Sequence, residues 1–446
     1  MAWLSTCRRD QVALFHFSRQ PAGSIVSVMK HFFMRSLSVW IAASLLLTGC
    51  GIGGSNSDPV DADIRIGALV DLSGDNSASG SQLENAILQA ASDAKTLGVI
   101  VGVEVRDTQS DPAIAVQQLN ELLALGVRVF VGPSTSSEAA AVLPVANAAG
   151  ALLVSESSTA QSLAIPNDAL YRLSPTNIVE AQTSVDLIRL RGQRSLITVN
   201  RDDLGNNETA SAVRQAAAAA GLSLQAPIRY PASDQTDFNA IASVVAEQVA
   251  AAAPSGDTSP VGIYVSGFDE VEYLFADMRA NVALTGIATY GSSAIATADY
   301  VVSSAGPAFF GVYNKAIPSP LLEIPAEQLS QAEQITDEIG GTTPNAFTLN
   351  AYDAVILMAQ AYLLNPDFGA GGAGARQSFV QAADGYTGLT GTIELNAAGD
   401  RASGYYSYWG VCSVQGFINW HIVGSWTPVS PNATRGTARF VGCPAQ

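Results

Sequence analysis

Charged residues are scarce in this sequence, and positively charged ones are the scarcest. Charged side chains make up 14% of the 446 residues, with 22 Lys and Arg against 39 Asp and Glu, which gives a formal net charge of −17. Nucleic acids and anionic lipid surfaces attract proteins through clusters of Lys and Arg. The charge balance therefore excludes nucleic acid as a partner.

Histidine and the common catalytic motifs are also nearly absent. The chain has 3 histidines and neither an H-E-x-x-H nor a G-x-S-x-G segment, so nothing predicts a His-rich zinc site or a serine nucleophile. The stretch "GAGGAG" at 369–374 has dinucleotide-binding spacing, but it follows "NPD" instead of a strand, which favours a flexible loop. We predict no enzyme activity, no cofactor and no metal. A hydrolase stays open as an alternative, since it needs only two acids about 5–10 Å apart.

The one long apolar run lies near the N-terminus. Basic residues up to Arg35 precede "SLSVWIAASLLLTGC", which is too short for a stable membrane span and is typical of a secretory signal. Its end, Leu47 to Cys50, resembles the bacterial lipobox, in which the cysteine is lipidated. We predict a lipoprotein signal peptide over 1–49, lipidation of Cys50 and a flexible tether over 50–62. The protein would then lie in the bacterial cell envelope with the lipid as its only membrane anchor. An ordinary leader ending in cysteine is the alternative.

Cysteine is rare as well, with 4 in the chain. Once the signal peptide is removed and Cys50 carries the lipid, Cys412 and Cys443 are left. The cell envelope is oxidising, so a disulfide between them that pins the C-terminal tail is the favoured reading. Two unrelated buried thiols are the alternative.

Short apolar segments alternate with helical ones from Asp63 onward. This alternation is typical of the α/β class, with parallel sheets and right-handed crossovers. The rhythm restarts after "YRLSPT", and the length of the chain favours two domains. The expected strands include "IRIGALVDL", "VRVFVG", "ALLVSES", "SLITVN" and "VGIYVSG", with a long helix at "TLNAYDAVILMAQAYLL" and aromatic strands over 404–428.

Four segments, in order, carry a resemblance to a known family. They are "IRIGALVDLSGDNSASG", "GVRVFVGPSTSSEAAAVLPVANAAGALLVSESST", "AYDAVILMAQA" and "LTGTIELNAAGDR". The chain resembles type I periplasmic binding proteins from about Asp63 to Trp426, in the branch for branched-chain amino acids, amides and related ligands. The resemblance implies two Rossmann-like lobes joined by three crossover strands, with the ligand in the cleft. It places lobe 1 at 63–174 plus 312–395 and lobe 2 at 175–311 plus 396–446, with crossings near Pro175, Gly311 and Asn396.

Four hydroxyl residues, Ser134 to Ser137, stand where a strand gives way to a helix. The first N–H groups of a helix lack intrahelical partners, and the helix dipole makes this end positive. A parallel sheet brings such ends to the edge where ligands bind. By the family pattern, the hydroxyl and N–H of Ser136 would hold a ligand carboxylate. Helix capping is the alternative for these hydroxyls.

A second hydroxyl cluster, "VSESST" at 154–159, ends the next strand. By the family pattern, Ser157, Ser158 and Thr159 would complete the cradle for the carboxylate. Because the two clusters end successive strands of one lobe, we expect Ser136 and Thr159 to be neighbours. A turn that caps the following helix is the alternative reading.

The chain departs from the family pattern on the other side of the expected cleft. Ser79 and Leu204 stand where relatives have aromatics, while Phe268 keeps one. Where an acid usually binds the ligand ammonium, this chain has Ser292 or Ser293. Asp202 and Asp203 lie next to Leu204, and Asp269 lies next to Phe268. An amino acid, an aliphatic amide or a small organic acid would therefore suit the site.

These patterns together predict a lipid-anchored, extracytoplasmic solute-binding protein. It would capture a small polar ligand by lobe closure and present it to the permease of an ABC importer. The alternative is an envelope sensor or scaffold lipoprotein that uses the same fold to bind a protein partner.

Overall fold

The computed structural model describes residues 62–231, 233, 235–430 and 433–445. The predicted signal peptide, the predicted lipidation site Cys50 and the predicted tether up to residue 61 lie outside the described residues. Everything described belongs to one compact unit.

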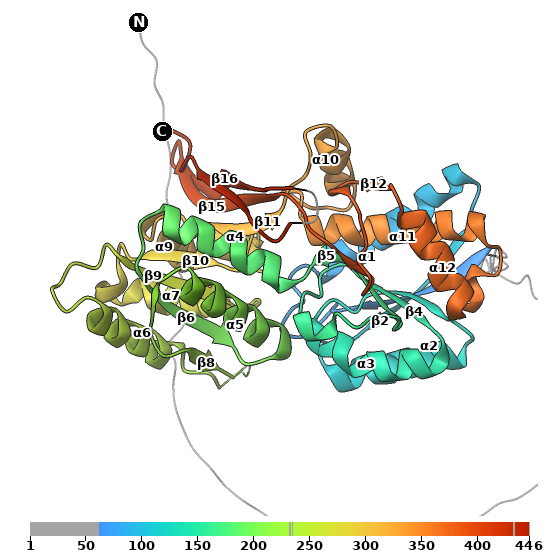
Figure 1. Cartoon of the computed structure of the whole chain (residues 1–446), viewed down its shortest axis with the longest axis horizontal. Helices are drawn as coiled ribbons and strands as arrows, with labels where there is room; N and C mark the ends of the chain where they lie inside the picture. Colours follow the sequence, from blue (N-terminus) through green and yellow to red (C-terminus); the bar gives the residue numbers. More distant parts are fainter. Residues whose placement is uncertain (1–61, 232, 234, 431–432, 446) are drawn as a thin grey trace, which may run out of the picture. The chain divides into compact units, whose positions relative to one another are not determined.

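The first lobe is built on a parallel sheet in the order β14-β5-β4-β3-β1-β2. Its side chains alternate between two helical layers: Ile66 and Ala68 face one layer, whereas Leu69 faces the other. Figure 1 shows α11, late in the sequence, beside the early helix α1, and α12 beside α11. The strands are β1 (Ile64–Val70), β2 (Val101–Asp107), β3 (Val129–Val131), β4 (Leu152–Ser155), β5 (Leu170–Pro175) and β14 (Asp400–Arg401). The helices are α1 (Gly80–Asp93), α11 (Ala346–Leu364) and α12 (Gly372–Ala383) on one face, and α2 (Pro112–Ala124) and α3 (Ser136–Ala149) on the other.

The second lobe repeats this arrangement with a parallel sheet in the order β10-β9-β6-β7, where β6 also pairs with β8. One face packs against α6, α7 and α9, and the other against α4 and α5. The strands are β6 (Ser195–Arg201), β7 (Ser223–Leu224), β8 (Ile228–Tyr230), β9 (Val261–Ser266) and β10 (Ala288–Gly291). The helices are α4 (Asn177–Leu190), α5 (Leu204–Ala219), α6 (Phe238–Ala252), α7 (Val271–Ala280), α8 (Asp299–Ser303) and α9 (Ala305–Tyr313). The two-lobed α/β fold predicted from the sequence is confirmed.

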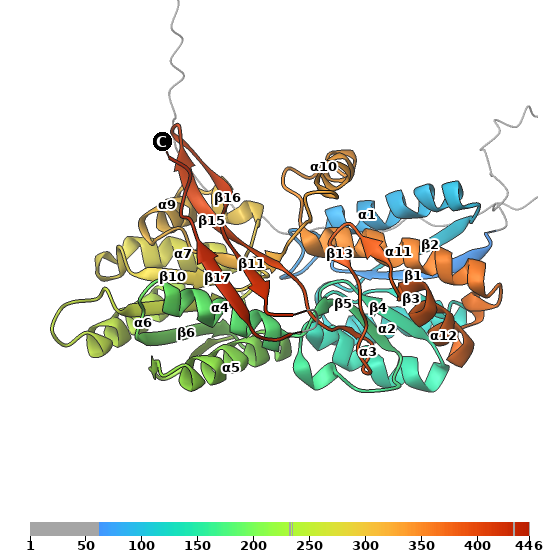
Figure 2. The ribbon, with the colours of Figure 1, turned by 45° about the horizontal axis from the view of Figure 1, so that its top comes forward.

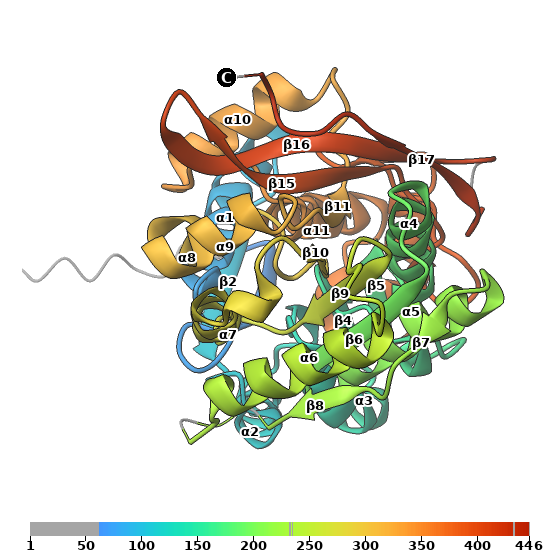
Figure 3. The same cartoon turned by 90° about the vertical axis from the view of Figure 1, so that its left-hand side faces the viewer.

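A third, antiparallel sheet is attached to lobe 2. Its order is β11 (Ser319–Leu322), β15 (Tyr406–Val414), β16 (Phe417–Pro428) and β17 (Gly436–Phe440). Figures 2 and 3 show the long β15–β16 ribbon lying along this lobe. Val411 and Trp420 enter the same apolar core as β6 and β9, and Trp426 is fully buried against α4 and β10 residues. The aromatic tail is therefore part of the core of lobe 2.

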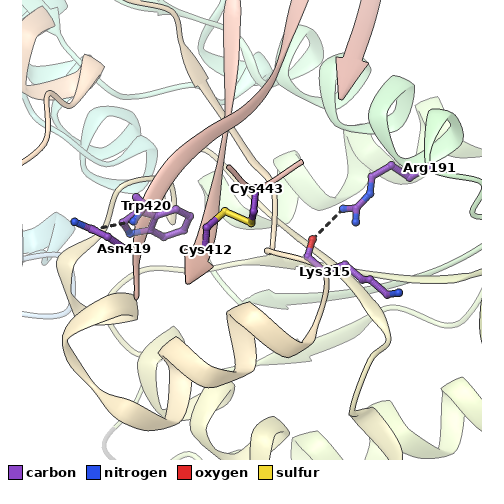
Figure 4. Close-up of a disulfide and its surroundings, with 6 residues drawn as sticks. All are labelled: Arg191, Lys315, Cys412, Asn419, Trp420 and Cys443. Carbon is purple, nitrogen blue, oxygen red and sulfur yellow. Dashed lines mark hydrogen bonds between the residues drawn. A yellow bond between two sulfur atoms is a disulfide. The ribbon is translucent and has the colours of Figure 1, made fainter. Parts of the chain in front are cut away.

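The predicted disulfide is confirmed. Cys412 in β15 bonds to Cys443, which follows β17, across a sequence separation of 31. Figure 4 shows the bond beside Trp420 of β16. It fastens the C-terminal end of the described chain to the buried strand β15, where Cys412 is 0% exposed.

The chain passes between the lobes three times: from β5 to α4, from β11 to α10 (Leu329–Glu338), and from β14 to β15. Gly311 lies inside α9, where a β-carbon would meet Val411 of lobe 2 at 2.7 Å. Asn396 precedes β14, which pairs with β5 in the sheet of lobe 1. Gly311 therefore still belongs to lobe 2, and Asn396 still belongs to lobe 1. The second and third passages between the lobes come later in the chain than these two residues.

Two smaller features complete the fold. The helix α11 is long and apolar enough to cross a membrane, but 67% of its apolar window is buried inside the protein, which is typical of a core helix. The predicted loop at 369–374 instead joins the short 3₁₀ helix η4 (Phe368–Ala370) to α12, and its last three residues already belong to α12. Short elements elsewhere are η1 (Ala94–Leu97), η2 (Gln161–Leu163), η3 (Val282–Leu284), β12 (Thr387–Gly388) and β13 (Gly391–Thr392).

Candidate ligand-binding site

A cavity of about 130 Å³ lies between the two lobes, at the carboxyl ends of the parallel strands. Ligands of open α/β sheets bind at this edge. Most of the lining is uncharged and polar: 18 of the 30 lining residues are Ser, Thr, Asn or Gln. The charged residues in the lining are all acidic: Glu180, Asp269 and Asp299. None of the lining residues is Lys, Arg or His.

The start of α3 forms one wall of this cavity. Thr135 caps the helix by accepting the N–H of Glu138 at 3.3 Å, and the Glu138 carboxylate bonds back to the N–H of Thr135. One residue thus does the capping. Ser136 is left for another role, and its hydroxyl lines the cavity at the positive end of the helix.

The second hydroxyl cluster lies against Ser136, as expected. The N–H groups of Thr159 and Ala160 each donate to Ser136 Oγ at 3.2 Å. Ser157 and Thr159 line the cavity, and Ser157 Oγ donates to the carbonyl of Ser134 at 2.8 Å. Ser158 does not line it, because its hydroxyl points to Ser136 Oγ at 3.2 Å and the residue is 1% exposed. Ser158 therefore supports the site from behind.

The start of α5 in lobe 2 faces the start of α3. Asp203 caps α5 by accepting the N–H of Asn206 at 2.9 Å, so the adjacent Gly205 and Asn206 come to line the cavity. A β-carbon on Gly205 would lie 3.3 Å from Ser136 Oγ. Two positive helix ends from opposite lobes thus converge on one point, which favours a ligand with a negative end.

Leu204 does not line the cavity, although the sequence placed it there. Its backbone N–H donates to Ser137 Oγ across the cleft at 3.3 Å, and its side chain packs against the apolar core around α2 and α3. Asp202 and Asp203 do not line it either: Asp202 accepts Asn207 Nδ2 at 2.8 Å, and Asp203 caps α5.

Glu180 of α4 is the residue that the sequence interpretation missed. It is 3% exposed and lines the cavity, and its carboxylate accepts the N–H and hydroxyl of Ser293 at 2.9 and 2.7 Å and the hydroxyl of Tyr264 at 3.2 Å. Burial raises the pKa of Glu180, and these donors oppose the rise. Ser292 also lines the cavity, and its buried hydroxyl has no hydrogen-bond partner among the described residues.

The loop after β9 supplies the aromatic wall. Phe268 lines the cavity as predicted, and the Arg201 guanidinium lies 5.3 Å from its ring centroid. The neighbouring Asp269 accepts the N–H of Ala78, from the first loop of lobe 1, at 2.8 Å. Burial, aided by the Glu270 and Asp75 carboxylates and opposed by this N–H, raises the pKa of Asp269 to about 6.

The two lobes are clasped on this side. Arg201 of lobe 2 pairs with Asp75 of lobe 1 at 3.0 Å, while it also contacts Glu270 at 3.2 Å and Asp203 at 3.0 Å. The N–H of Asp269 donates to the carbonyl of Asp75 at 3.4 Å. The first loop of lobe 1 is therefore held by charges from lobe 2.

Buried acids lie beneath the wall at the start of α3. Asp71, Glu138 and Glu156 are at most 2% exposed. Burial and the hydrogen-bonded Asp71 carboxylate raise the pKa of Glu138 to about 8. The described residues contain no group of three or more His, Cys, Asp or Glu able to hold a metal ion. A proton held by Glu138 relieves the repulsion between this carboxyl and the neighbouring Asp71 carboxylate.

Two α/β lobes, three passages of chain between them and a polar cavity in the cleft define a two-lobed binding protein that closes over a small ligand. The family model described as periplasmic binding protein matches residues 63–406. The chain belongs to this family, in its type I branch, as the four sequence segments indicated. It is therefore a solute-binding protein and not an enzyme, as the family match implies.

Two known proteins are similar to this chain in sequence. An uncharacterised protein of Methanocaldococcus jannaschii, MJ1266, is 27% identical over 390 residues, which cover 81% of this chain and 89% of that protein. The Leu/Ile/Val-binding protein BraC3 of Rhizobium johnstonii is 34% identical over 106 residues, 23% of this chain and 29% of that protein.

Solved structures show the same fold at low sequence identity. The leucine-binding protein LivK of Thermotoga maritima has a TM-score of 0.67 at 16% identity, over 80% of this chain and 97% of that one. LivJ of Streptococcus pneumoniae, in complex with isoleucine, has 0.65 at 19%, over 81% and 99%. A Rhodopseudomonas palustris solute-binding protein in complex with benzoate has 0.66 at 18%, over 86% and 99%.

Proposed function

We propose that this chain is a lipid-anchored receptor of the cell envelope that captures a small amino acid and delivers it to the permease of an ABC importer. The observation that carries the proposal is the pairing of two chemistries in one cavity. Lobe 1 offers the positive end of α3 with Ser136 and Thr159, and lobe 2 offers the buried carboxyl of Glu180. A ligand with a carboxylate and an ammonium satisfies both.

The anionic end of the ligand accounts for the hydroxyls around Ser136. Two helix N-termini, those of α3 and α5, point at this place, and no basic side chain lines the cavity to compete for the anion. N–H groups and hydroxyls bind a carboxylate without the desolvation cost of a buried Lys or Arg.

The cationic end accounts for Glu180. A buried carboxylate without a positive partner is costly, because burial disfavours the charged form. Its hydrogen bonds from Ser293 and Tyr264 lower that cost but bring no charge. A ligand ammonium at Glu180 supplies the charge, which an aliphatic amide or a simple organic acid does not.

Closure of the lobes is the proposed mechanism. A ligand bound to Ser136 on one lobe and to Glu180 on the other makes more contacts in the closed form than in the open form, so it shifts the population towards closure. The permease would recognise the closed form. The lipid on Cys50 would keep the receptor at the membrane, within reach of that permease.

Calorimetric titration of the mature protein with amino acids, amides and small organic acids tests the ligand class. We expect saturable binding of at least one amino acid and weaker binding of the amide and the acid that lack its ammonium. Mass spectrometry of ligand released on denaturation is the independent readout. Absence of any small ligand in both experiments would reject the proposal and favour a protein partner, as in the sensor or scaffold reading.

The lipid anchor needs a separate test. Growth with a radiolabelled fatty acid should label the wild-type protein and leave the Cys50→Ser variant unlabelled. A labelled Cys50→Ser variant, or an unlabelled wild type, would contradict the anchor without affecting the ligand assignment.

A further inference from the structure

We infer that the ligand carries a second positive charge on its side chain, so that the natural ligand is a basic amino acid such as lysine, ornithine or arginine. This inference rests on the proposed function, since it takes the amino-acid backbone at Ser136 and Glu180 as given. It concerns the remaining part of the same cavity, around Asp269, Asp299 and Ser292.

The cavity holds more negative charge than a neutral amino acid can match. Once the ligand ammonium pairs with Glu180, Asp269 and Asp299 still line the cavity without a basic residue beside them in the lining. The hydrogen bonds that Asp269 and Asp299 accept come from neutral donors, the N–H of Ala78 at 2.8 Å and the hydroxyl of Thr342 at 3.4 Å. Asp299 is exposed and needs no partner, whereas Asp269 is partly buried, and a cationic side chain on the ligand would supply its missing partner.

Arg201 does not fill this role, although it lies close to the loop that carries Asp269. Its guanidinium is already in contact with Asp75, Asp203 and Glu270 at 3.0 to 3.2 Å. Three carboxylates share one positive charge there, so this edge of the cavity stays negative. The pKa of Asp269 is raised to about 6 in keeping with this, since burial and the Glu270 and Asp75 carboxylates both disfavour its charge.

Ser292 adds an independent observation. The residue lines the cavity and is 2% exposed, and its buried hydroxyl oxygen has no hydrogen-bond partner among the described residues. Buried hydroxyls normally find a partner. A ligand ammonium or guanidinium has N–H groups to donate to it, whereas a branched aliphatic side chain has none.

The apolar residues that line the cavity also favour a basic amino acid. Leu83 is the one lining residue with a long aliphatic side chain, and the large apolar surfaces are the rings of Phe268, Tyr300 and Phe347. Aromatic faces suit the methylene stem of a basic side chain, whose charged end stays with polar groups. A Leu or Ile side chain would instead bury hydroxyls and acids against hydrocarbon, which is costly.

The charge of the whole chain supports the same ligand. A net charge of −17 produces a negative potential that attracts cations to the cleft and repels anions. The field therefore favours a net positive amino acid over glutamate or aspartate.

Calorimetric titration of the mature protein with lysine, ornithine, arginine, leucine and glutamate tests the inference. We expect the tightest of the three basic amino acids to bind at least about ten-fold more tightly than leucine, because a charged hydrogen bond is gained. The Asp269→Asn/Asp299→Asn double variant should lose that preference, so that the affinity for the basic amino acid falls to about that for leucine. The control Glu247→Gln removes one exposed charge from α6 and should keep the preference.

Each result decides something. Equal or tighter binding of leucine or glutamate overturns the inference and leaves the proposed function standing. Failure of all five amino acids to bind overturns the inference, and the proposed function falls with it only if the wider ligand panel and mass spectrometry also find no small ligand. A preference for basic ligands that survives in the double variant also overturns the inference, because the acids assigned to the cation would then not hold it.

Discussion

Gly205 of lobe 2 lies directly over Ser136 of lobe 1. A β-carbon at residue 205 would come within 3.3 Å of Ser136 Oγ and 3.4 Å of its β-carbon. This proximity brings the first turns of α5 and α3 together across the cleft, so the positive ends of both helices face the same space. The absence of a side chain at Gly205 therefore allows the lobes to close while both helix ends contact the anionic end of the ligand.

The Gly205→Ala substitution should weaken ligand binding. A contact of 3.3–3.4 Å is tighter than most real contacts of a β-carbon, so the lobes would have to separate slightly or Ser136 would have to turn. We expect a loss of affinity of about ten-fold or more, measured by calorimetry, with little change in stability. Gly369→Ala is the matched control, because nothing lies within 4 Å of its β-carbon position. Unchanged affinity in Gly205→Ala would show that the helix ends do not close on the ligand.

The Ser136→Ala substitution should remove one contact to the ligand carboxylate. It also leaves the N–H groups of Thr159 and Ala160 without their acceptor, so the loop after β4 should loosen. We expect a loss of affinity of about ten-fold and a loss of stability of about 1 kcal/mol. Ser243→Ala, an exposed position on α6, serves as the control. Wild-type affinity in Ser136→Ala would remove this hydroxyl from the site.

Two substitutions distinguish the contribution of Arg201 to the stability of lobe 2 from its contribution to the contact between the lobes. Arg201→Gln leaves Asp203 and Glu270 without their cation within lobe 2, and we expect it to lower the unfolding free energy by about 3 kcal/mol. Asp75→Asn removes only the pair across the cleft, and Asp75 is half exposed, so its cost in stability should stay below about 1 kcal/mol.

The ligand response should distinguish these two variants further. Asp75→Asn should bind ligand more weakly and show less closure by small-angle scattering, at nearly wild-type stability. A variant with full closure and full affinity would mean that the Arg201–Asp75 pair has no part in holding the lobes together.

The Glu138 carboxyl should make the protein less stable as the pH rises. Burial and Asp71 raise its pKa from 4.5 to about 8 in the folded state, so the folded protein holds a proton that the unfolded chain loses first. The stabilisation is complete below about pH 4.5 and is lost between pH 4.5 and pH 8. Glu138→Gln imitates the protonated form, and it should flatten this part of the curve of unfolding free energy against pH. An unchanged slope in the variant would assign the pH dependence to other groups, Glu156 first among them.

Loss of the disulfide should affect stability and leave binding intact. Cys412 and Cys443 are 31 residues apart, and a cross-link of this length stabilises a protein by roughly 3–4 kcal/mol in the chain-entropy model. The Cys412→Ser/Cys443→Ser variant should therefore unfold at lower denaturant concentration. Its ligand affinity should match the wild type, because neither cysteine lines the cavity. A large fall in affinity would show that the antiparallel sheet helps to set the closed form.

The sequence predicted those parts of the site that depend on where strands end. Ser136 and Thr159 follow successive parallel strands, so their proximity follows from topology alone. Glu180 could not be found this way, because it lies within a helix that enters the cleft only after the chain has crossed to lobe 2. The sequence did offer one signal for Glu180: it is an acidic residue that follows the predicted crossing at Pro175 by only five residues. The inward or outward direction of Ser158 and Leu204 depends on local turn geometry, which neither spacing nor composition determines.

Lobe 1 is assembled from two separate stretches of sequence, with α11 filling the middle of its core. A gene shortened after Pro175 would encode five of the six strands of its sheet but neither α11 nor α12, and would leave one face of that sheet covered by α1 alone. A single proteolytic nick between β11 and α10, by contrast, would leave the halves tied by the two remaining segments. Because of this connectivity, the lobes cannot be produced separately by cutting the gene once. A protein nicked between β11 and α10 should still open and close.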